Sequence, residues 1–340
     1  LSPQGVNGGK DFLTTPLETT KNIERLSEMS TRNFGEAVKS FMTAGIKPKW
    51  FLPIAPQGAQ IGKNTFLEQK SLGKAPGRFD SRTNTWRGLG GGYVVKGIEK
   101  SDFEEMKSWP TPNAGILGRA YPGIDSDAGS EEAKELVEYC LHKAFGKGAN
   151  YAERIRGAGP RRLYAFKSVD PNNEKAVVRT RHLSYKLAGD DTVHGLDIIG
   201  FGNQYVITGI HPSGDQYGWN PNASLQDFST VDALTEIDND DAERFLSILT
   251  EEIAAEGGEV IKSSGGRHGN EEIDTTGLKP VMSIADALEG LRRIPNTPEN
   301  YPFRDDLVSV LSAVRAALGK DADKAEQDLR DWATEDPEWC

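Results

Sequence analysis

Residues 123–127, which read Gly-Ile-Asp-Ser-Asp, lie between an apolar lead-in and a helical pattern that begins at residue 131. Side chains of a strand alternate between the two faces of a sheet, so Asp125 and Asp127 should point the same way. Two neighbouring carboxylates repel each other unless a cation lies between them. The stretch therefore predicts a strand, followed directly by a helix, that carries a divalent-metal site. The alternative is a polar turn in which Asp127 or Ser130 caps the helix.

The composition indicates a folded protein with long loops. With 340 residues, the chain has room for two domains and a substantial core. Glycine and proline are plentiful, at 37 and 18 residues, and this favours a mixed α/β or α+β fold. The two cysteines, Cys140 and Cys340, are too few for a disulfide framework or a four-ligand zinc site. Cys140 is most simply a core residue of a predicted helix.

The sequence gives no sign of a membrane segment. No apolar run approaches the roughly 20 residues that span a bilayer, and the first residues lack the basic and apolar regions of a signal peptide. We therefore expect a cytoplasmic protein without a membrane partner. Leu1 is not a natural first residue, so we also expect the chain to be a fragment of a longer protein.

The net charge of −11 is the sum of a positively charged N-terminal part of the chain and a strongly negative C-terminal part. Residues 215–340 hold 11 Lys and Arg against 28 Asp and Glu, whereas residues 1–214 hold 29 against 23. Within residues 151–189, nine basic residues stand against three acidic ones. A local excess of this size is what a polyphosphate ligand needs. The alternative is a solvated basic loop.

The chain divides into four regions. Residues 1–30 are polar and interrupted by Gly and Pro, and we interpret them as an N-terminal arm with a short helix at 18–27. Residues 31–256 form the main domain, and residues 257–282 have the Gly-rich, charged composition of a linker. Residues 283–340 carry helical patterns and predict a small helical module, truncated at its end.

Hydrophobic periodicity predicts the elements of the main domain. The predicted helices are 33–45, 101–109, 131–145 and 240–256, and the predicted strands are 50–54, 161–167, 196–199 and 204–208. The last two strands, joined by a turn at 200–202, predict a hairpin. In the strand 161–167, Arg162, Tyr164 and Phe166 share one face.

Asp197 is a third carboxylate, in a strand that is otherwise apolar. A carboxylate is costly to bury without a partner. We therefore expect Asp197 to form one site with Asp125 and Asp127. The alternative is an exposed position on a half-solvated sheet face.

The order of these parts resembles the bifunctional primase-polymerase domains of the archaeo-eukaryotic primase superfamily, which occur in phage and plasmid replication proteins. The Asp-x-Asp strand at 123–127 is similar to the first motif of that family. Its third motif is a strand acid followed later by a His-Pro-Ser-Gly string, and residues 195–200 and 211–214 are similar to it. Tyr217 and Trp219 then follow, as they do in the family.

Two further stretches are similar to the family. They are the Lys-x-Pro string at 74–76 and the helix-Gly-strand-Pro opening that ends at Pro53. The residues after Ser283 resemble the helical module that often follows such primase domains.

The second motif departs from the common pattern. Most members carry Ser-x-His or Gly-x-His, whereas this chain has Pro160-Arg161-Arg162, which looks like a phage-type subgroup. The triphosphate contact of the motif is therefore carried over to Arg162 and, as second choice, to Arg161. Adjacent strand residues face opposite sides, and we favour Arg162, on the face of Tyr164.

The resemblance implies an α+β catalytic core with an RNA-recognition-motif-like sheet, followed by the helical module. It implies a DNA primase-polymerase that makes and extends primers on single-stranded DNA from nucleoside triphosphates, in the host cytoplasm if a phage encodes it, with a helicase domain or protein as a further partner. Asp125, Asp127 and Asp197 would be catalytic and would hold two Mg²⁺ or Mn²⁺ ions. The residues expected to bind the nucleotide are Arg162, Arg161, His211, Lys74 and Arg156.

Two other classes of protein remain open. A metal-dependent transferase that uses a nucleotide-sugar could carry an Asp-x-Asp pair. It would not need a third acid on another strand, with a basic strand between the two acidic strands in the sequence. A non-catalytic replication protein that binds single-stranded nucleic acid could use the basic residues alone, with a steep salt dependence and no consumption of triphosphates.

Overall fold

The computed structural model of the 340-residue chain contains two compact units, residues 1–266 and 267–340, and each is described by itself. The structure describes residues 32–63, 65–157, 159–264, 282–293, 310–311, 313–315, 317–318, 321 and 324–333. The predicted N-terminal arm, with its helix at 18–27, lies outside the described residues.

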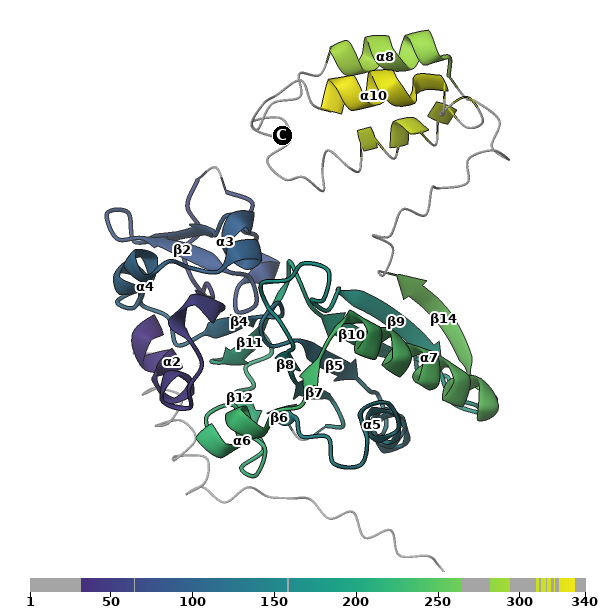
Figure 1. Cartoon of the computed structure of the whole chain (residues 1–340). Helices are drawn as coiled ribbons and strands as arrows, with labels where there is room; N and C mark the ends of the chain where they lie inside the picture. The colour runs from purple at the N-terminus through teal and green to yellow at the C-terminus, as the bar shows by residue number, and fades with distance from the viewer. Residues whose placement is uncertain are drawn as a thin grey trace, which may run out of the picture. The chain divides into compact units, whose positions relative to one another are not determined.

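Seven strands form the main sheet of the first unit (Figure 1). In spatial order they are β12 (Tyr217–Trp219), β6 (Ala152–Arg156), β7 (Arg162–Ala165), β5 (Gly123–Asp127), β10 (His194–Ile199), β9 (Arg181–Lys186) and β14 (Glu259–Ser264). All neighbouring strands are antiparallel. The predicted strand at 123–127 is confirmed, and its residues 123–126 have cross-strand partners in both β7 and β10.

Two long helices, α5 (Glu131–Phe145) and α7 (Asn239–Ala255), pack against one face of the main sheet (Figure 1). α5 begins at Ser130, whose hydroxyl oxygen accepts a hydrogen bond from the Ala133 N–H. The predicted helix is confirmed, and of the two capping residues named in the alternative, Ser130 is the cap. The apolar side of each helix meets the sheet residues Ile124, Tyr164 and Leu196 in one buried cluster. This face of the sheet is therefore core.

A second, three-stranded antiparallel sheet consists of β1 (Phe51–Pro53), β4 (Ala114–Leu117) and β11 (Gln204–Thr208). It shares a buried cluster with α2 (Phe34–Thr43) and with Leu163 and Ala165 of the main sheet. Part of the other face of the main sheet is thus covered as well, and the rest of that face remains open.

Smaller elements complete the first unit. They are the 3₁₀ turns η1 (Pro48–Trp50) and η2 (Gln69–Ser71), the paired strands β2 (Gly77–Asp80) and β3 (Thr85–Gly88), the short helices α3 (Gly91–Lys96), α4 (Lys100–Met106) and α6 (Phe228–Ala233), and the parallel pair β8 (Lys167–Ser168) and β13 (Glu236–Ile237). Cys140 is fully buried, as expected.

The predicted hairpin of residues 196–199 and 204–208 is wrong. Both edges of β10 are occupied, by β5 and β9, so β11 crosses to pair with β4 in the other sheet. The turn between them passes close to another loop, because a Cβ on Gly200 would lie 2.0 Å from the Val178 carbonyl oxygen. The local turn signal is real, but the pairing partner is not local.

The predicted linker begins later than residue 257. Residues 259–264 form β14, which pairs with β9 at the edge of the main sheet. The stretch Glu259–Ser264 contains Val260 and Ile261, so it supplies an edge strand despite its glycine-rich surroundings.

The second unit is helical where it is described. α8 (Ile284–Arg292) begins at the predicted Ser283, whose hydroxyl oxygen accepts the Asp286 N–H. In α10 (Glu326–Ala333), the Trp332 indole donates to the Leu291 carbonyl oxygen at 3.2 Å. The chain as a whole is α+β, as predicted. Among the described residues, none of the helices has the length and apolar character that crossing a membrane requires.

Candidate functional site

Three carboxylates lie together on one face of the main sheet. Asp197 in β10 is the direct cross-strand partner of Asp125 in β5, and side chains opposite each other in antiparallel strands point to the same face. Asp127 is two residues along β5 and therefore shares that face. We call this side of the sheet the acid face. The sequence-based expectation that the three acids converge is consistent with this register.

The acid face is opposite the face covered by α5 and α7. The side chains of Asp125, Asp127 and Asp197 are 31%, 52% and 45% exposed, so a ligand can reach all three. Ile124 and Ser126, which alternate with the acids along β5, are fully buried on the helix side.

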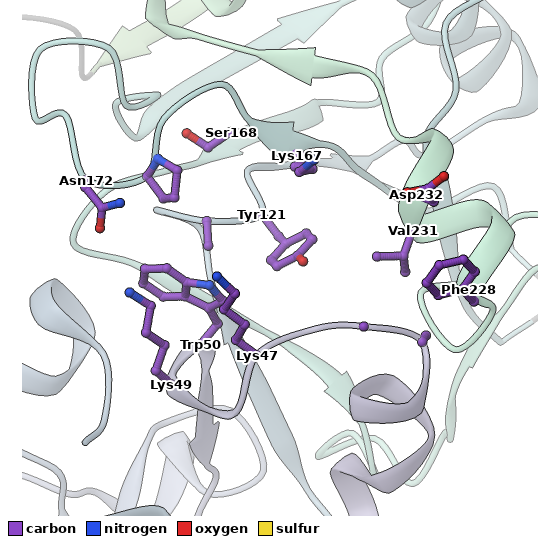
Figure 2. Close-up of a pocket in the computed structure, with 14 residues that line it drawn as sticks. Lys47, Lys49, Trp50, Tyr121, Lys167, Ser168, Asn172, Phe228, Val231 and Asp232 are labelled. Atoms are coloured by element: carbon purple, nitrogen blue, oxygen red, sulfur yellow. The ribbon is translucent and has the colours of Figure 1, made fainter. Parts of the chain in front are cut away.

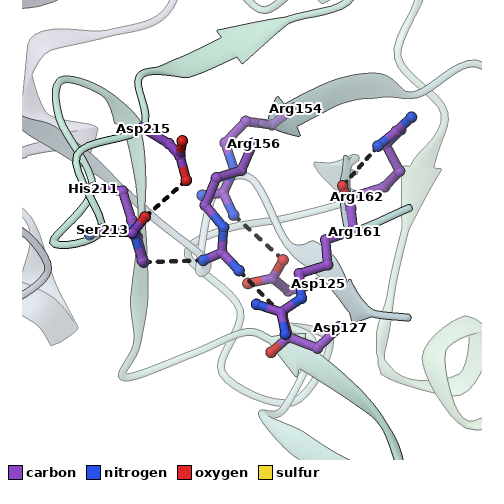
Figure 3. Close-up of polar contacts among 9 residues, drawn as sticks. All are labelled: Asp125, Asp127, Arg154, Arg156, Arg161, Arg162, His211, Ser213 and Asp215. Atoms are coloured by element: carbon purple, nitrogen blue, oxygen red, sulfur yellow. Dashed lines mark hydrogen bonds and ion pairs between the residues drawn. The ribbon is translucent and has the colours of Figure 1, made fainter. Parts of the chain in front are cut away.

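Arginines on β6 contact the acids across the sheet, as Figure 3 shows. The Nη2 atom of Arg154 lies 3.3 Å from Asp125 Oδ1, and the Nη2 atom of Arg156 lies 3.5 Å from Asp127 Oδ1. Arg161, just before β7, places its Nε atom 3.5 Å from the same Asp127 oxygen. Three cationic groups thus border three acids on one surface.

Arg154 is the most buried member of this group, at 6% exposure. Its guanidinium donates to the Val206 carbonyl oxygen and to Asp125, and its Cζ atom lies 4.9 Å from the centroid of the Tyr217 ring. A side chain on Gly123 would meet the ring of Tyr205, with its Cβ 2.9 Å from Cε1. The glycine therefore lets Tyr205 lie beside Arg154.

Burial raises the pKa of the Asp125 carboxyl above its ordinary value, and the Arg154 guanidinium opposes that rise. Although part of its side chain is open to solvent, Asp125 is crowded by the surrounding protein atoms. Two buried polar atoms next to it, Arg154 Nε and the Tyr205 hydroxyl, have no hydrogen-bond partner among the described residues. Unsatisfied buried polar groups are uncommon in folded proteins, and both of these atoms carry a proton that they can donate to a further acceptor.

His211 extends the cationic side of the site. Its Nε2 atom lies 3.0 Å from Arg156 Nη1, and because a guanidinium can only donate, Nε2 must accept. The Nδ1 atom lies 2.6 Å from the Ser213 hydroxyl oxygen and 3.0 Å from the Ser213 backbone nitrogen. Ser213 in turn donates to Asp215 at 2.8 Å (Figure 3). The predicted His-Pro-Ser-Gly string thus supplies a hydrogen-bonded support that orients Arg156.

Burial, together with the charges of Arg156 and Lys74, lowers the pKa of His211 to about 4. The unfolded chain binds this proton near pH 6.5, so the stability contributed by neutral His211 should be complete above pH 6.5 and be lost as the pH falls towards 4. We expect the variant His211→Gln, whose amide can make both hydrogen bonds, to lose about 1 kcal/mol less over that interval, after allowance for solvent screening. Urea denaturation near pH 7 and near pH 4.5 measures the difference.

The surface variant His142→Gln is the matched control for removing a histidine from the first unit. Equal pH dependence of unfolding in the wild type and in His211→Gln would contradict the proposed neutral state of His211.

Asp197 has a partner that the sequence did not indicate. The Nδ1 atom of His182, on β9, lies 2.6 Å from Asp197 Oδ1, and its Nε2 atom lies 2.8 Å from the Ser184 hydroxyl. His182 is the cross-strand neighbour of Asp197, so it extends the acid face by one more strand.

The expectation that Arg162 faces the acids is wrong. Arg162 is the cross-strand partner of Ser126 and Ile155 and therefore lies on the helix side of the sheet. Its Nε atom pairs with Glu153 Oε1 at 2.7 Å, and Figure 3 shows it turned away from Asp127. The shared face with Tyr164 was correctly predicted, but that face is core, so Arg161 is the arginine that reaches the acids.

The remaining candidates lie beside the acid face. Arg156 contacts both Asp127 and His211. Lys74 is exposed and close enough to affect the charge of His211, and its carbonyl oxygen accepts from the side chain of Gln204 at 2.8 Å. The structure thus brings together seven of the eight candidates and separates Arg162.

Sequence reasoning missed Arg154 and His182 as site residues. Arg154 alternates with Arg156 at the two-residue period of β6, a signal that would have placed both on one face once the strand was recognised. For His182 no local signal exists, because its role comes from the pairing of β9 with β10.

Three carboxylates on one open face are the ligand type that Mg²⁺ and Mn²⁺ prefer. In the part of the chain that the structure describes, however, no three acidic, histidine or cysteine side chains are arranged so as to hold a metal ion. The carboxylate oxygens of the three acids are contacted by Arg154, Arg156, Arg161 and His182. The donor set fits such ions in kind, and binding them requires the acids to exchange part of these contacts.

Comparison with known proteins does not assign the chain to a family. No family model, curated protein or solved structure matches it. The geometry of the acid face therefore carries the functional information in this chain.

Proposed function

We propose that this chain is a nucleotidyltransferase of the primase-polymerase type, with a primase-like catalytic core in its first unit. The observation that carries the proposal is the register that places Asp197 opposite Asp125, with Asp127 on the same face. Acids from β5 and β10 and arginines from β6 and the start of β7 then form one surface with both signs of charge. A transfer reaction on a nucleoside triphosphate needs both.

The cationic residues would bind the triphosphate. Arg156 and Arg161 both point to Asp127, and a guanidinium holds phosphate oxygens in pairs. The hydrogen bond from Arg156 to His211 fixes the orientation of that guanidinium, and the neutral His211 ring adds no second positive charge beside it. Lys74 adds a further positive charge at the edge.

Asp125, Asp127 and Asp197 would hold Mg²⁺ or Mn²⁺. The bound ions would activate the attacking 3′-hydroxyl and neutralise charge on the leaving pyrophosphate. The register of the strands holds the three carboxylates on one face, and the buried Arg154 holds Asp125 in place from the side.

The test is incorporation of labelled nucleotides on single-stranded DNA. The purified chain is incubated with ribo- or deoxynucleoside triphosphates and Mg²⁺ or Mn²⁺, with and without a primer, and a chelator is the control. Metal-dependent extension is expected. Hydrolysis of a sugar nucleotide with no incorporation would select the transferase alternative.

One observation favours a second candidate, a non-catalytic protein that binds single-stranded DNA. Each of the three acids is already paired with a cationic or histidine side chain, which is what a site without metal ions would also require. Salt-dependent binding of single-stranded DNA without consumption of triphosphates in the presence of either metal would select this candidate.

Arg161 and Arg162 are adjacent and chemically identical, so they form a matched pair for a mutational test. Arg161→Ala should raise the KM for the triphosphate about tenfold and leave stability nearly unchanged, because its side chain is 55% exposed. Arg162→Ala should instead destabilise the fold by roughly 1–3 kcal/mol, because Glu153 loses its cationic partner and keeps only the hydrogen bond from Asn220. Steady-state kinetics and urea denaturation of both variants distinguish the two roles, and the reverse assignment of effects would contradict the placement.

A further inference from the structure

A pocket of about 380 Å³ lies away from the acids, at the other end of β5 (Figure 2). Tyr121, which lines it, precedes the first residue of β5, whereas Asp127 is the last. The walls come from the segment after α2, from β8 with the loop behind it, and from α6. A volume of this size is within the range of sites for small organic ligands.

The charge of the lining is positive. Lys47, Lys49 and Lys167 line the pocket, and Asp232 is the one acid among the lining residues. The Nζ atom of Lys167 is 2.8 Å from Glu236 Oε1, so this lysine is partly neutralised. Lys47 and Lys49 make no ion pair among the described residues. Together they would attract an anion.

The same lining offers aromatic surface. Trp50 and Tyr121 form part of the wall, and Phe228 stands at the pocket with 63% of its surface exposed. Lys49 already lies over the Trp50 ring, with Nζ 4.0 Å from the ring centroid. An exposed phenylalanine beside a cationic wall is a surface on which a planar ring can stack.

Two hydroxyl groups supply hydrogen-bonding capacity. The Ser168 side chain is 3% exposed and lines the pocket, and its Oγ atom has no hydrogen-bond partner among the described residues. Burial raises the pKa of Tyr121 to about 12, so its hydroxyl keeps the proton and can donate. Figure 2 shows the Tyr121 ring in the middle of the pocket. Native proteins rarely leave a buried hydroxyl unsatisfied.

We propose that this pocket binds a nucleoside phosphate, with the phosphate at Lys47 and Lys49 and the base against Phe228. Positive charge, an exposed aromatic ring and spare hydroxyl groups within one cavity of this volume match a ligand that combines an anion with a planar ring. The ligand is either a free nucleotide or the phosphorylated end of a nucleic-acid strand. The inference concerns a second site and does not depend on catalysis at the acid face.

Calorimetric titration with ADP, with EDTA present so that no metal ion mediates binding, tests the proposal on the full chain. Saturable binding is expected, and adenosine and inorganic phosphate should each bind at least about tenfold more weakly than ADP. Lys47→Ala combined with Lys49→Ala should weaken ADP about tenfold or more, whereas Lys39→Ala, an exposed lysine of α2 outside the pocket, should not.

A separate variant tests the proposed contact between the base and Phe228. Phe228→Ala should weaken ADP but leave inorganic phosphate unchanged, because it removes only the stacking surface. Tyr139→Ala is the matched control, since Tyr139 is 53% exposed and lies outside the lining. All five substituted side chains are wholly or partly exposed, so the variants should fold, and thermal denaturation checks this.

Competition with a short oligodeoxynucleotide identifies the source of the ligand. Displacement of ADP by the 5′-phosphorylated strand, but not by the 5′-hydroxyl strand, would assign the pocket to a strand end, and displacement by neither would assign it to a free nucleotide. No saturable ADP binding, binding unaffected by the lysine variants, or phosphate binding as tightly as ADP would each overturn the proposal. Failure of nucleotide incorporation at the acid face would leave these titrations unchanged, so the two proposals fail separately.

Discussion

Asp125→Asn should lower nucleotide incorporation about a thousandfold, which is the largest effect on activity that we expect from a single substitution. Asparagine keeps the shape of the side chain but removes the negative charge that a metal ion would need. Asp197→Asn should have a comparable effect, because Asp197 is opposite Asp125 on the same face. The assay is primer extension with saturating triphosphates and Mg²⁺ or Mn²⁺.

Asp191→Asn is the control, because Asp191 is an exposed acid in the loop just before β10 and is not on the acid face. Its activity should remain within a factor of about two of the wild type. Urea denaturation of each variant separates loss of chemistry from loss of fold. Extension by Asp125→Asn at the wild-type rate would remove these acids from the reaction.

Arg154→Met should destabilise the first unit by about 3–5 kcal/mol, the largest effect on stability that we expect. Methionine keeps an apolar stem but leaves Asp125 without its partner in a crowded position and the Val206 carbonyl oxygen without its donor. Without Arg154, the pKa of Asp125 should rise further. The loss should therefore be smaller near pH 5, where Asp125 can bind a proton, than near pH 8.

The double variant Arg154→Met with Asp125→Asn shows which lost contact causes the destabilisation. If the unpaired carboxylate is responsible, the double variant should recover more than half of the lost stability, as judged by urea denaturation. Losses that simply add would show that Arg154 stabilises the fold through its other contacts. Arg87→Met, at an exposed position of β3, should change stability by less than about 0.5 kcal/mol.

Local patterns in the sequence are sufficient to predict the strand and the helix around Asp125 and Asp127. The two-residue period placed Asp125 and Asp127 on one face, and the apolar spacing of Leu136, Cys140 and Leu141 gave the helix α5. Both signals depend only on residues within one element, which is why they could be interpreted without knowing the fold.

Local patterns do not indicate which distant strands pair with each other. Arg162 was placed on the face of Tyr164, and this is correct, but only the packing of α5 and α7 reveals that this face is core. The hairpin prediction failed for the same reason, since the occupied edges of β10 are a property of the whole sheet. His182 likewise became a partner of Asp197 only through β9.

The direct pairing of residue 125 with residue 197 also constrains how such a chain can diverge. Adding or deleting one residue inside β5 or β10 would move one acid to the helix-covered face, because the side-chain period of a strand is two. Loops carry no such requirement. Descendants of this sequence should therefore vary in length at 187–193, while the spans 123–127 and 194–199 keep their residue count.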